Sequence, residues 1–443
     1  MSFRRALGPF DATMVVVGGI VGSGIFILPS VVAQRLPTSA LVLLAWAAGG
    51  AIALAGAFAF AELATLFPRA GGEYTYLREA YPPVVAFLFG WASLVMIQGG
   101  GLAAVAITFA QYAMRLLSLE TGSAPIWAAV AIAIVAFVNY VGVKPGSRLL
   151  NVLVILKIAA LAALIGGGFL LPHSAPPAPP AAGPQPPSAG IAAFGGALVP
   201  ILFAYGGWQS LNLIAEETRD PRRTLPRALV AGTAIVVFIY LAANIVYLKI
   251  LTRPGLAATP TPAADAARLL FGPGADRLIA ASIAVSAFGF LDLTLLAQTR
   301  IYYAMGRDGL FFESLARIHP RFQTPAFAIL LQAVWGIVLV LTGTYSELVD
   351  SVVFGDWIFF GLTVLGVFLF RRRIPLESRD ESAFRTPGYP WFPALFLAAA
   401  ALAVVSAVRT NPARSLVGTG LLAAGVPIYL FFARRRPASE PGR

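Results

Sequence analysis

The sequence MVVVGGIVGSGIF at residues 14–26 decides the fold, together with VPILFAYGGWQS at residues 199–210. Each stretch places a cluster of glycines inside a long apolar run. A single cluster of this kind most often marks a face where two membrane helices pack closely. Two clusters that open corresponding halves of a chain instead indicate two interrupted helices, which are the best sequence signal for the midplane site of a transporter.

Interrupting a helix inside a bilayer has a chemical consequence. Backbone N–H and C=O groups freed at the break are costly if they stay unpaired in hydrocarbon, so breaks persist only beside a polar cavity or a ligand. The half-helix that begins after the break presents N–H groups and a positive dipole end, and the half-helix that ends there presents carbonyls. Such a pair of poles suits a zwitterion that carries a carboxylate and an ammonium group.

The composition is that of a membrane protein. Of the 443 residues, 58% are apolar and 12% are charged, against about 25% charged in soluble globular proteins. The apolar runs are continuous rather than alternating, which excludes a membrane β-barrel. The chain has no cysteine, so it can form no disulfide, thiolate metal site or covalent link to a partner subunit.

Twelve apolar runs are candidates for membrane spans. The sequence therefore predicts an all-α integral membrane protein with twelve transmembrane helices. The expected spans are Phe10 to Gln34, Ala40 to Leu66, Val84 to Leu116, Pro125 to Val141, Leu149 to Leu171, Ile191 to Ile214, Ala228 to Leu251, Arg277 to Met305, Pro325 to Leu341, Ser346 to Phe370, Trp391 to Val408 and Leu416 to Phe432.

The glycine clusters open the first and sixth spans, so we expect a five-plus-five inverted repeat followed by two accessory helices. The first repeat would occupy residues 1–171 and the second residues 190–373, with the accessory helices at 374–433. Residues 172–189 are rich in proline and predict an extended loop on the outer side. Residues 434–443 form a basic cytoplasmic tail.

The formal net charge of +12 is explained by the positions of the basic residues. With the N-terminus in the cytoplasm, most Lys and Arg fall in loops on the inner side, which is the orientation signal of membrane proteins. We therefore expect both termini in the cytoplasm, with the basic loops facing anionic lipid. The net positive charge therefore does not indicate a nucleic-acid partner.

Four strings make the chain similar to a known family: GSGIF at 22–26, AELATLFPRAGGEYTYL at 61–77, FAYGGWQSLNLIAEETRDPRRTLPRAL at 203–229, and RIYYAMGRDGLF at 300–311 followed by HPRFQTP at 319–325. The chain resembles the amino acid, polyamine and organocation transporter superfamily, and within it the bacterial relatives of the L-type amino-acid transporters. The resemblance implies a location in the bacterial inner membrane.

The resemblance also implies a substrate site between the two interrupted helices. The substrate carboxylate would sit on Gly22, Ser23, Gly24 and Ile25. Its ammonium would be held by carbonyls of Ile20, Val21, Phe203, Ala204 and Gly206. Tyr205 belongs to the same site, Phe203 matches the outer gate of the family, and Gly206 leaves room for the substrate side chain.

Lys157 lies in the fifth span between apolar neighbours. Burying a charged lysine at membrane depth costs free energy, so such a residue is expected to have a function. Alternatively, a lysine two turns from the end of a span could extend to the cytoplasmic interface. In sodium-independent members of the L-type group, a lysine at this place resembles a substitute for a bound sodium ion that braces the first span against the eighth. On this basis we expect sodium-independent transport.

Asp292 lies near the middle of the eighth span, where close relatives often carry an amide. Three interpretations remain open. The acid could pair with Lys157, join a polar cluster with Gln98 of the third span, or stay neutral because burial disfavours its charge. A neutral acid that ionises on one side of the cycle would permit proton coupling. Gln209, directly after the second glycine cluster, is a further polar candidate for the pocket.

Several charged residues sit at the cytoplasmic ends of the spans: Glu62, Glu73, Glu216, Glu217 and the arginines of the TRDPRR and GRDG motifs. We expect them to form a gate and anchor network, although exposed ion pairs contribute only about 0–1 kcal/mol each. Asp350 and Asp356 receive no role.

The function that we expect is sodium-independent exchange of neutral L-amino acids by alternating access, with proton symport as the alternative. We expect no cofactor and no metal. Mammalian relatives bind a heavy-chain glycoprotein through a cysteine, so this chain is expected to work alone. An intramembrane enzyme is the remote alternative, but the chain's two histidines lie in loops, and no ligand set is spaced for a metal. An amino-acid sensor on the same scaffold would carry a signalling domain or a long tail.

Overall fold

The first apolar run forms two helices instead of one. Helix α1 (Pro9–Ile20) ends four residues before α2 (Gly24–Arg35) begins, and their axes are bent by 41°. The sixth run is also interrupted, because α9 (Ile191–Ala204) is followed by a turn and then by the short α10 (Ser210–Leu213). Both glycine clusters therefore interrupt their helices, as the sequence predicts.

The computed structural model describes residues 3–117, 123–172, 190–343, 345–374, 383–410 and 412–435. Regular structure in these ranges is helical, apart from one isolated bridge between Leu7 and Thr218. Most of the proline-rich loop expected at 172–189, and the tail from residue 436 onward, lie outside the described residues.

The remaining elements follow in chain order. They are α3 (Ser39–Leu66), α4 (Glu73–Ala80), α5 (Pro83–Ala92), the π-helix η1 (Ser93–Ile97), α6 (Gln98–Leu117), α7 (Ala124–Val141), α8 (Val143–Leu170), the 3-10 helix η3 (Ala215–Glu217), α11 (Pro221–Ala258), α12 (Pro262–Phe271), α13 (Ala275–Leu293), the π-helix η4 (Thr294–Gln298), α14 (Thr299–Arg307), the 3-10 helix η5 (Glu313–Ala316), α15 (Ala326–Thr342), α16 (Tyr345–Arg373), α17 (Trp391–Thr410) and α18 (Pro412–Arg435).

The helices have the length and composition of membrane spans. In the described part of the chain, nine are long and apolar enough to cross a bilayer, and the bent pair α1 and α2 makes a tenth. The two other expected spans correspond to the shorter apolar helices α9 and α15. The chain is therefore an all-α integral membrane protein, while the count of twelve spans stays a prediction.

The expected inverted repeat also stays a prediction, but the irregular turns occur in corresponding spans. The first and sixth expected spans are broken. The third and eighth expected spans each contain a five-residue π-helix, η1 and η4, and each of these is followed by further α-helix. Such turns occur frequently at functional sites.

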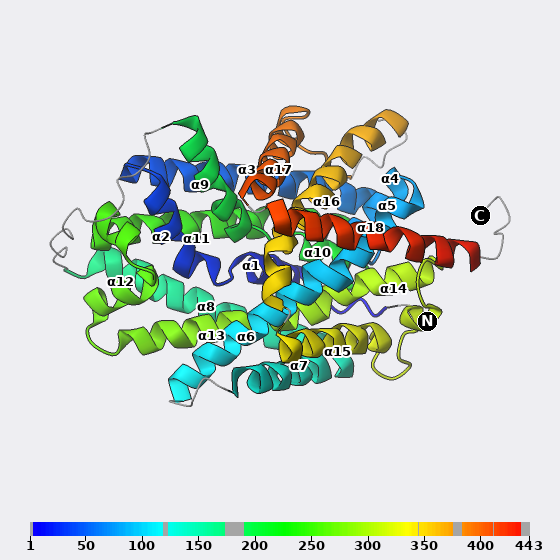
Figure 1. The fold of residues 1–443 in the computed structure, drawn as a ribbon, viewed down its shortest axis with the longest axis horizontal. Coiled ribbons are helices and arrows are strands. Elements are labelled where there is room, and N and C mark those ends of the chain that lie inside the picture. The colour runs from blue at the N-terminus through cyan, green and yellow to red at the C-terminus, as the bar shows by residue number, and fades with distance from the viewer. Residues whose placement is uncertain are drawn as a thin grey trace.

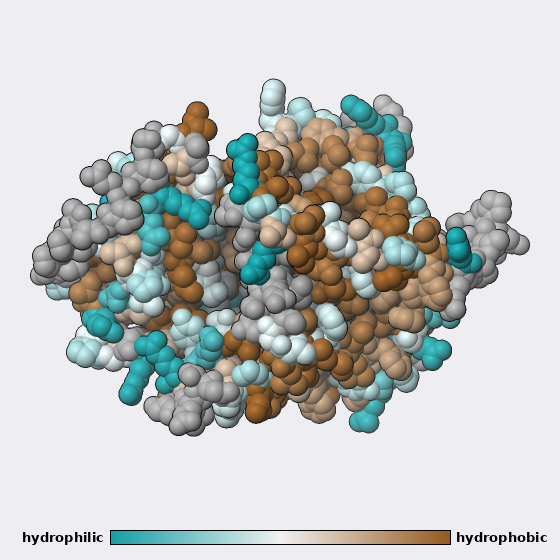
Figure 2. All heavy atoms as spheres, viewed as in Figure 1, coloured by the Kyte–Doolittle hydropathy of each residue, from teal (hydrophilic) through white to brown (hydrophobic). Residues whose placement is uncertain are grey.

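Helix α1 packs against α11, α8, α13 and α10, and in Figure 1 the ribbons of α1 and α10 lie near the middle of the molecule. Helix α14 and the C-terminal end of α18 lie at one end of the long axis, opposite α2 and α12. We call this end the terminal face. Hydrophobic side chains cover much of the side surface shown in Figure 2, as expected for contact with lipid tails.

The two breaks touch through glycine. Gly207 has a φ of 116°, which favours a residue without a side chain, and a Cβ on it would clash with the backbone of Gly19. A Cβ on Gly19 would in turn lie 3.0 Å from the carbonyl carbon of Gly207. This close approach is what brings the middle of the first span against the middle of the sixth.

Replacing Gly207 with alanine should therefore separate the two breaks. We expect Gly207→Ala to destabilise the protein by about 2 kcal/mol and lower its melting temperature. Gly166→Ala in α8 is the matched control, because a Cβ there meets no atom within 4 Å, and it should be neutral or stabilising. Equal melting temperatures for the two variants would contradict the packing of Gly207 on Gly19.

Candidate functional site

The first break leaves three backbone donors without a partner. Val21 N–H and Gly22 N–H donate to the carbonyls of Val17 and Ile20, both at 2.8 Å. The N–H groups of Ser23, Gly24 and Ile25 donate to no acceptor in the described part of the chain. These groups start α2, where the helix dipole is positive, and three free N–H groups at such an end are a site for a carboxylate.

The second break leaves two backbone acceptors free. The carbonyl of Phe203 accepts from Gly206 N–H at 3.1 Å, and that of Gly207 accepts from Ser210 N–H at 3.2 Å. The carbonyls of Tyr205 and Gly206, between them, accept no hydrogen bond from any described residue. These carbonyls follow the end of α9, which lies close to the start of α2, since a Cβ on Gly24 would be 3.3 Å from the Cβ of Ala204.

The residues at the breaks are accessible although the helices around them are buried. Gly22, Ser23, Gly24 and Gly206 are half-buried, whereas residues 15–21, Ile25 and Phe26 are buried. The Phe203 side chain is 55% exposed. Ser23, Gly24 and Gly206 are therefore partly accessible, whereas Ile25 and Tyr205 are buried.

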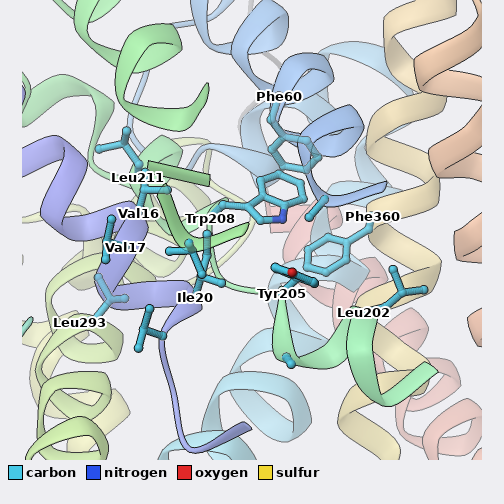
Figure 3. Packing of buried hydrophobic residues seen from close by; sticks show 14 of the residues in the cluster. Val16, Val17, Ile20, Phe60, Leu202, Tyr205, Trp208, Leu211, Leu293 and Phe360 are labelled. Carbon is cyan, nitrogen blue, oxygen red and sulfur yellow. The ribbon is translucent and has the colours of Figure 1, made fainter. Parts of the chain in front are cut away.

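Aromatic packing holds the second break in place. The Trp208 ring lies 4.7 Å from the Phe60 ring in an edge-on contact and 6.1 Å from the Phe360 ring. Figure 3 shows Trp208 between the turn and the surrounding helices, with Tyr205 beside it. Gln209, expected as a polar residue of the pocket, instead accepts the N–H of Gly207 at 2.9 Å through its side-chain oxygen. It therefore stabilises the turn.

Lys157 binds the end of α1. Its side chain is fully buried in α8, so it does not extend to the membrane surface. Its Nζ donates to the carbonyls of Gly18, at 2.9 Å, and Val21. Ser286 of α13 donates to the same Val21 carbonyl at 3.3 Å. The ammonium thus lies at the negative dipole end of α1, where this half-helix meets α13.

Tyr240 of α11 joins the two breaks. Its hydroxyl lies 2.9 Å from the carbonyl of Ile20 and 3.3 Å from that of Ala204, and the side chain is fully buried. The sequence did not single out this residue, because a tyrosine inside an apolar helix carries no signal of its partner. Ile20, Val21 and Phe203 thus already have protein donors, and Ala204 shares the single hydroxyl proton of Tyr240 with Ile20. Of the expected ammonium ligands, only the Gly206 carbonyl has no donor among the described residues.

Asp292 is paired with an amide. The buried carboxylate accepts from Asn139 of α7 at 2.7 Å. The other oxygen of Asp292 and the side-chain oxygen of Asn139 have no hydrogen-bond partner within the described ranges. The described contacts of Asp292 include neither Lys157, which binds the first break, nor Gln98, which follows η1. Of the three interpretations, these contacts favour the neutral acid.

A buried ion pair joins α14 to the segment that follows α10. Arg300 of α14 forms a two-point contact with Glu217, at 2.7 and 3.2 Å, and both side chains are only 1% exposed. The Glu217 carbonyl accepts from the N–H groups of Ala6 and Leu7, so the pair also holds the segment before α1. A buried pair of this kind is costly to break on one side, because a lone buried charge remains.

The other expected acids are distributed around this pair. Glu216 accepts from Arg307 at 2.9 Å and from the Ala70 N–H at 3.1 Å. Glu62 accepts twice from Arg371. Glu73, at the start of α4, accepts from Thr363 at 3.3 Å, and burial raises its pKa well above the ordinary value. Glu216 and Glu217 therefore tie the segment after α10 to α14 and to the segments before α1 and α4, while Glu62 and Glu73 bind α16.

Comparison with known proteins is consistent with this geometry. The family model described as amino acid permease matches residues 7–432. The chain is 30% identical to the serine/threonine exchanger SteT of Bacillus subtilis (strain 168), over 98% of both chains. It is 32% identical to the human b(0,+)-type amino acid transporter 1, over 84% of this chain and 77% of the relative. It is 29% identical to the human large neutral amino acids transporter small subunit 2, over 97% of this chain and 80% of the relative.

Removing the ammonium of Lys157 should loosen the first break. We expect Lys157→Met to cost about 2 kcal/mol, because the Gly18 carbonyl then stays buried without a donor, and the melting temperature should fall. Lys249→Met is the matched control, since Lys249 also donates to a helix carbonyl, that of Gly168 at 2.9 Å, but its side chain is exposed. A Lys157→Met protein as stable as the control would show that Lys157 does not hold α1.

Proposed function

The chain belongs to the amino acid permease family of the amino acid, polyamine and organocation transporters, and on this basis we propose that it is a sodium-independent exchanger of neutral L-amino acids. Membership of this family makes it an amino-acid transporter and not an enzyme. The substrate proposal rests on the backbone groups that have no partner among the described residues. These are the N–H groups of Ser23, Gly24 and Ile25 and the carbonyls of Tyr205 and Gly206.

The two poles match the parts that all amino acids share. The α-carboxylate would accept from the three N–H groups at the start of α2, and the α-ammonium would donate to the carbonyls of the second break. Neither residues 20–25 nor residues 203–209 include a charged side chain. A charged substrate side chain would find no counterion among them, which supports neutral substrates. Two relatives are named for serine and threonine and for large neutral amino acids, which agrees with this class.

Sodium independence is supported by the position of Lys157. Its fixed ammonium donates to the carbonyls of Gly18 and Val21. A bound sodium ion would seek the same type of oxygen ligand, so the lysine makes a second cation unnecessary there. We further propose that the terminal face lies in the cytoplasm of a bacterial inner membrane, and that the chain works without a covalently attached subunit, because it has no cysteine.

Exchange in proteoliposomes tests this function directly. Uptake of labelled serine or leucine should require unlabelled amino acid inside the vesicles and should be unchanged when sodium is replaced by choline. Ser23→Phe should abolish uptake by filling the space beside the free N–H groups, whereas Ser39→Phe, at the exposed start of α3, should leave it intact. A strict sodium requirement, or full uptake by Ser23→Phe, would contradict the proposal.

Proton symport is the second candidate, and the contact between Asp292 and Asn139 favours it. Asn139 donates to one carboxylate oxygen, while the second carboxylate oxygen and the amide oxygen are both left unpaired. Two acceptors without a donor are satisfied at once if the carboxyl group carries a proton. A protonated Asp292 would therefore be the stable form in the interface with Asn139. Release of this proton would be linked to the opening of the transporter.

The variant Asp292→Asn separates the two modes. An amide supplies a permanent donor, so exchange between equal amino-acid pools should continue at a similar rate, while accumulation driven by a pH gradient should disappear. The measurement is uptake with and without an inward proton gradient. Unchanged gradient-driven accumulation in the variant would exclude Asp292 as the proton carrier.

A further inference from the structure

We propose that the terminal face carries a binding site for a phosphate-bearing anion, formed by Arg4, Lys144 and Arg321. The three residues line a cavity of about 650 Å³, which we call the basic cavity. It lies apart from both helix breaks and from their free backbone groups. The proposal does not depend on which amino acid is transported.

The three cations come from segments that are distant in sequence. Arg4 precedes α1, Lys144 lies in the first turn of α8, and Arg321 lies in the loop between η5 and α15. The other lining residues are neutral: Phe3, Ala6, Val141, Gly142, Val143, Pro145, Phe322 and Gln323. The lining therefore gathers positive charge from three directions without an acid of its own.

Only one of these charges is matched by a nearby acid. Lys144 pairs with Asp11 at 3.3 Å and remains 43% exposed. The ion pairs of the described residues include neither Arg4 nor Arg321. The cavity thus keeps two arginines that form no ion pair with any described residue, and arginine binds phosphate oxygens in a two-point contact.

The loop that carries Arg321 is firmly built. Gln323 has a φ of 56°, in the left-handed region, and its N–H donates to the His319 carbonyl at 2.8 Å. The Nδ1 atom of His319 accepts from the N–H groups of Arg321 and Phe322. Thr324 donates to the Tyr140 carbonyl of α7 at 2.9 Å. A strained residue persists only where its surroundings hold it, and such strain gathers at ligand sites.

Lipid headgroups and free phosphate share this chemistry. Basic pockets between membrane helices bind anionic headgroups on the face where positive loops gather. The side chains of Phe3 and Phe322 line the same cavity and add an apolar wall that a glycerophospholipid can contact. A bound headgroup would link the segment before α1 to α8 and to the Arg321 loop. The buried Arg300–Glu217 pair also holds the segment before α1.

Binding to the purified full-length protein tests the site. The probes are phosphatidylglycerol, phosphatidylcholine and inorganic phosphate. Their binding is measured by thermal shift in detergent and by native mass spectrometry. The variant Arg4→Gln/Arg321→Gln should bind the anion on the order of twenty-five-fold more weakly, since each cation near a headgroup changes affinity about fivefold. Arg227→Gln/Arg372→Gln is the charge-matched control, because both residues are exposed and neither lines the cavity.

The outcomes separate the sources and decide the proposal. Stabilisation by phosphatidylglycerol alone identifies a headgroup site, and stabilisation by inorganic phosphate identifies a site for the free ion; in both cases the site variant must lose the effect and the control must keep it. The charge-keeping variant Arg4→Lys/Arg321→Lys should bind more tightly than the glutamine variant but more weakly than the unchanged protein, because lysine keeps the charge and loses the two-point contact; this distinguishes lost charge from misfolding. Equal binding by the site variant and the control, or no anion-dependent stabilisation of the unchanged protein, would overturn the proposal.

Discussion

The structure depends on how the backbone groups freed by the two helix breaks are satisfied inside a bilayer. Protein donors already serve the carbonyls at the end of α1: Lys157 on Gly18 and Val21, and Tyr240 on Ile20. Among the residues that the structure describes, the N–H groups of Ser23, Gly24 and Ile25 and the carbonyls of Tyr205 and Gly206 have no such partner. Because unpaired groups at membrane depth are costly, a substrate that supplies both missing partners gains binding energy from the fold itself.

This arrangement explains why the surroundings of the breaks are so tightly built. Gly19 and Gly207 bring the two backbones into contact, and the Trp208 ring against Phe60 fixes the second turn. The buried Arg300–Glu217 pair fixes α14 and the segment before α1 relative to the second break. Rigid anchors on each side of a break keep its backbone groups in place when no ligand is bound, which reduces the entropy lost on binding.

The sequence predicted the parts that local pattern encodes. Glycine clusters located both breaks, and a lone lysine in an apolar run marked Lys157. Pattern could not reveal pairings between distant residues: Tyr240 with the carbonyls of two breaks, Asn139 with Asp292, or Arg300 with Glu217. The short helices α4 and α12 and the π-helices η1 and η4 were also missed, because each is set by packing more than by a period in the sequence.

The most direct test of backbone recognition compares ligands that lack either the amino group or the carboxylate of the amino acid. Calorimetric titration would compare leucine with 4-methylpentanoate, which lacks the amino group, and with 3-methylbutylamine, which lacks the carboxylate. Loss of either group should weaken binding by about a hundredfold or more, because a buried pole is then left unpaired. Binding of either analogue within a few-fold of leucine would contradict recognition by the two breaks.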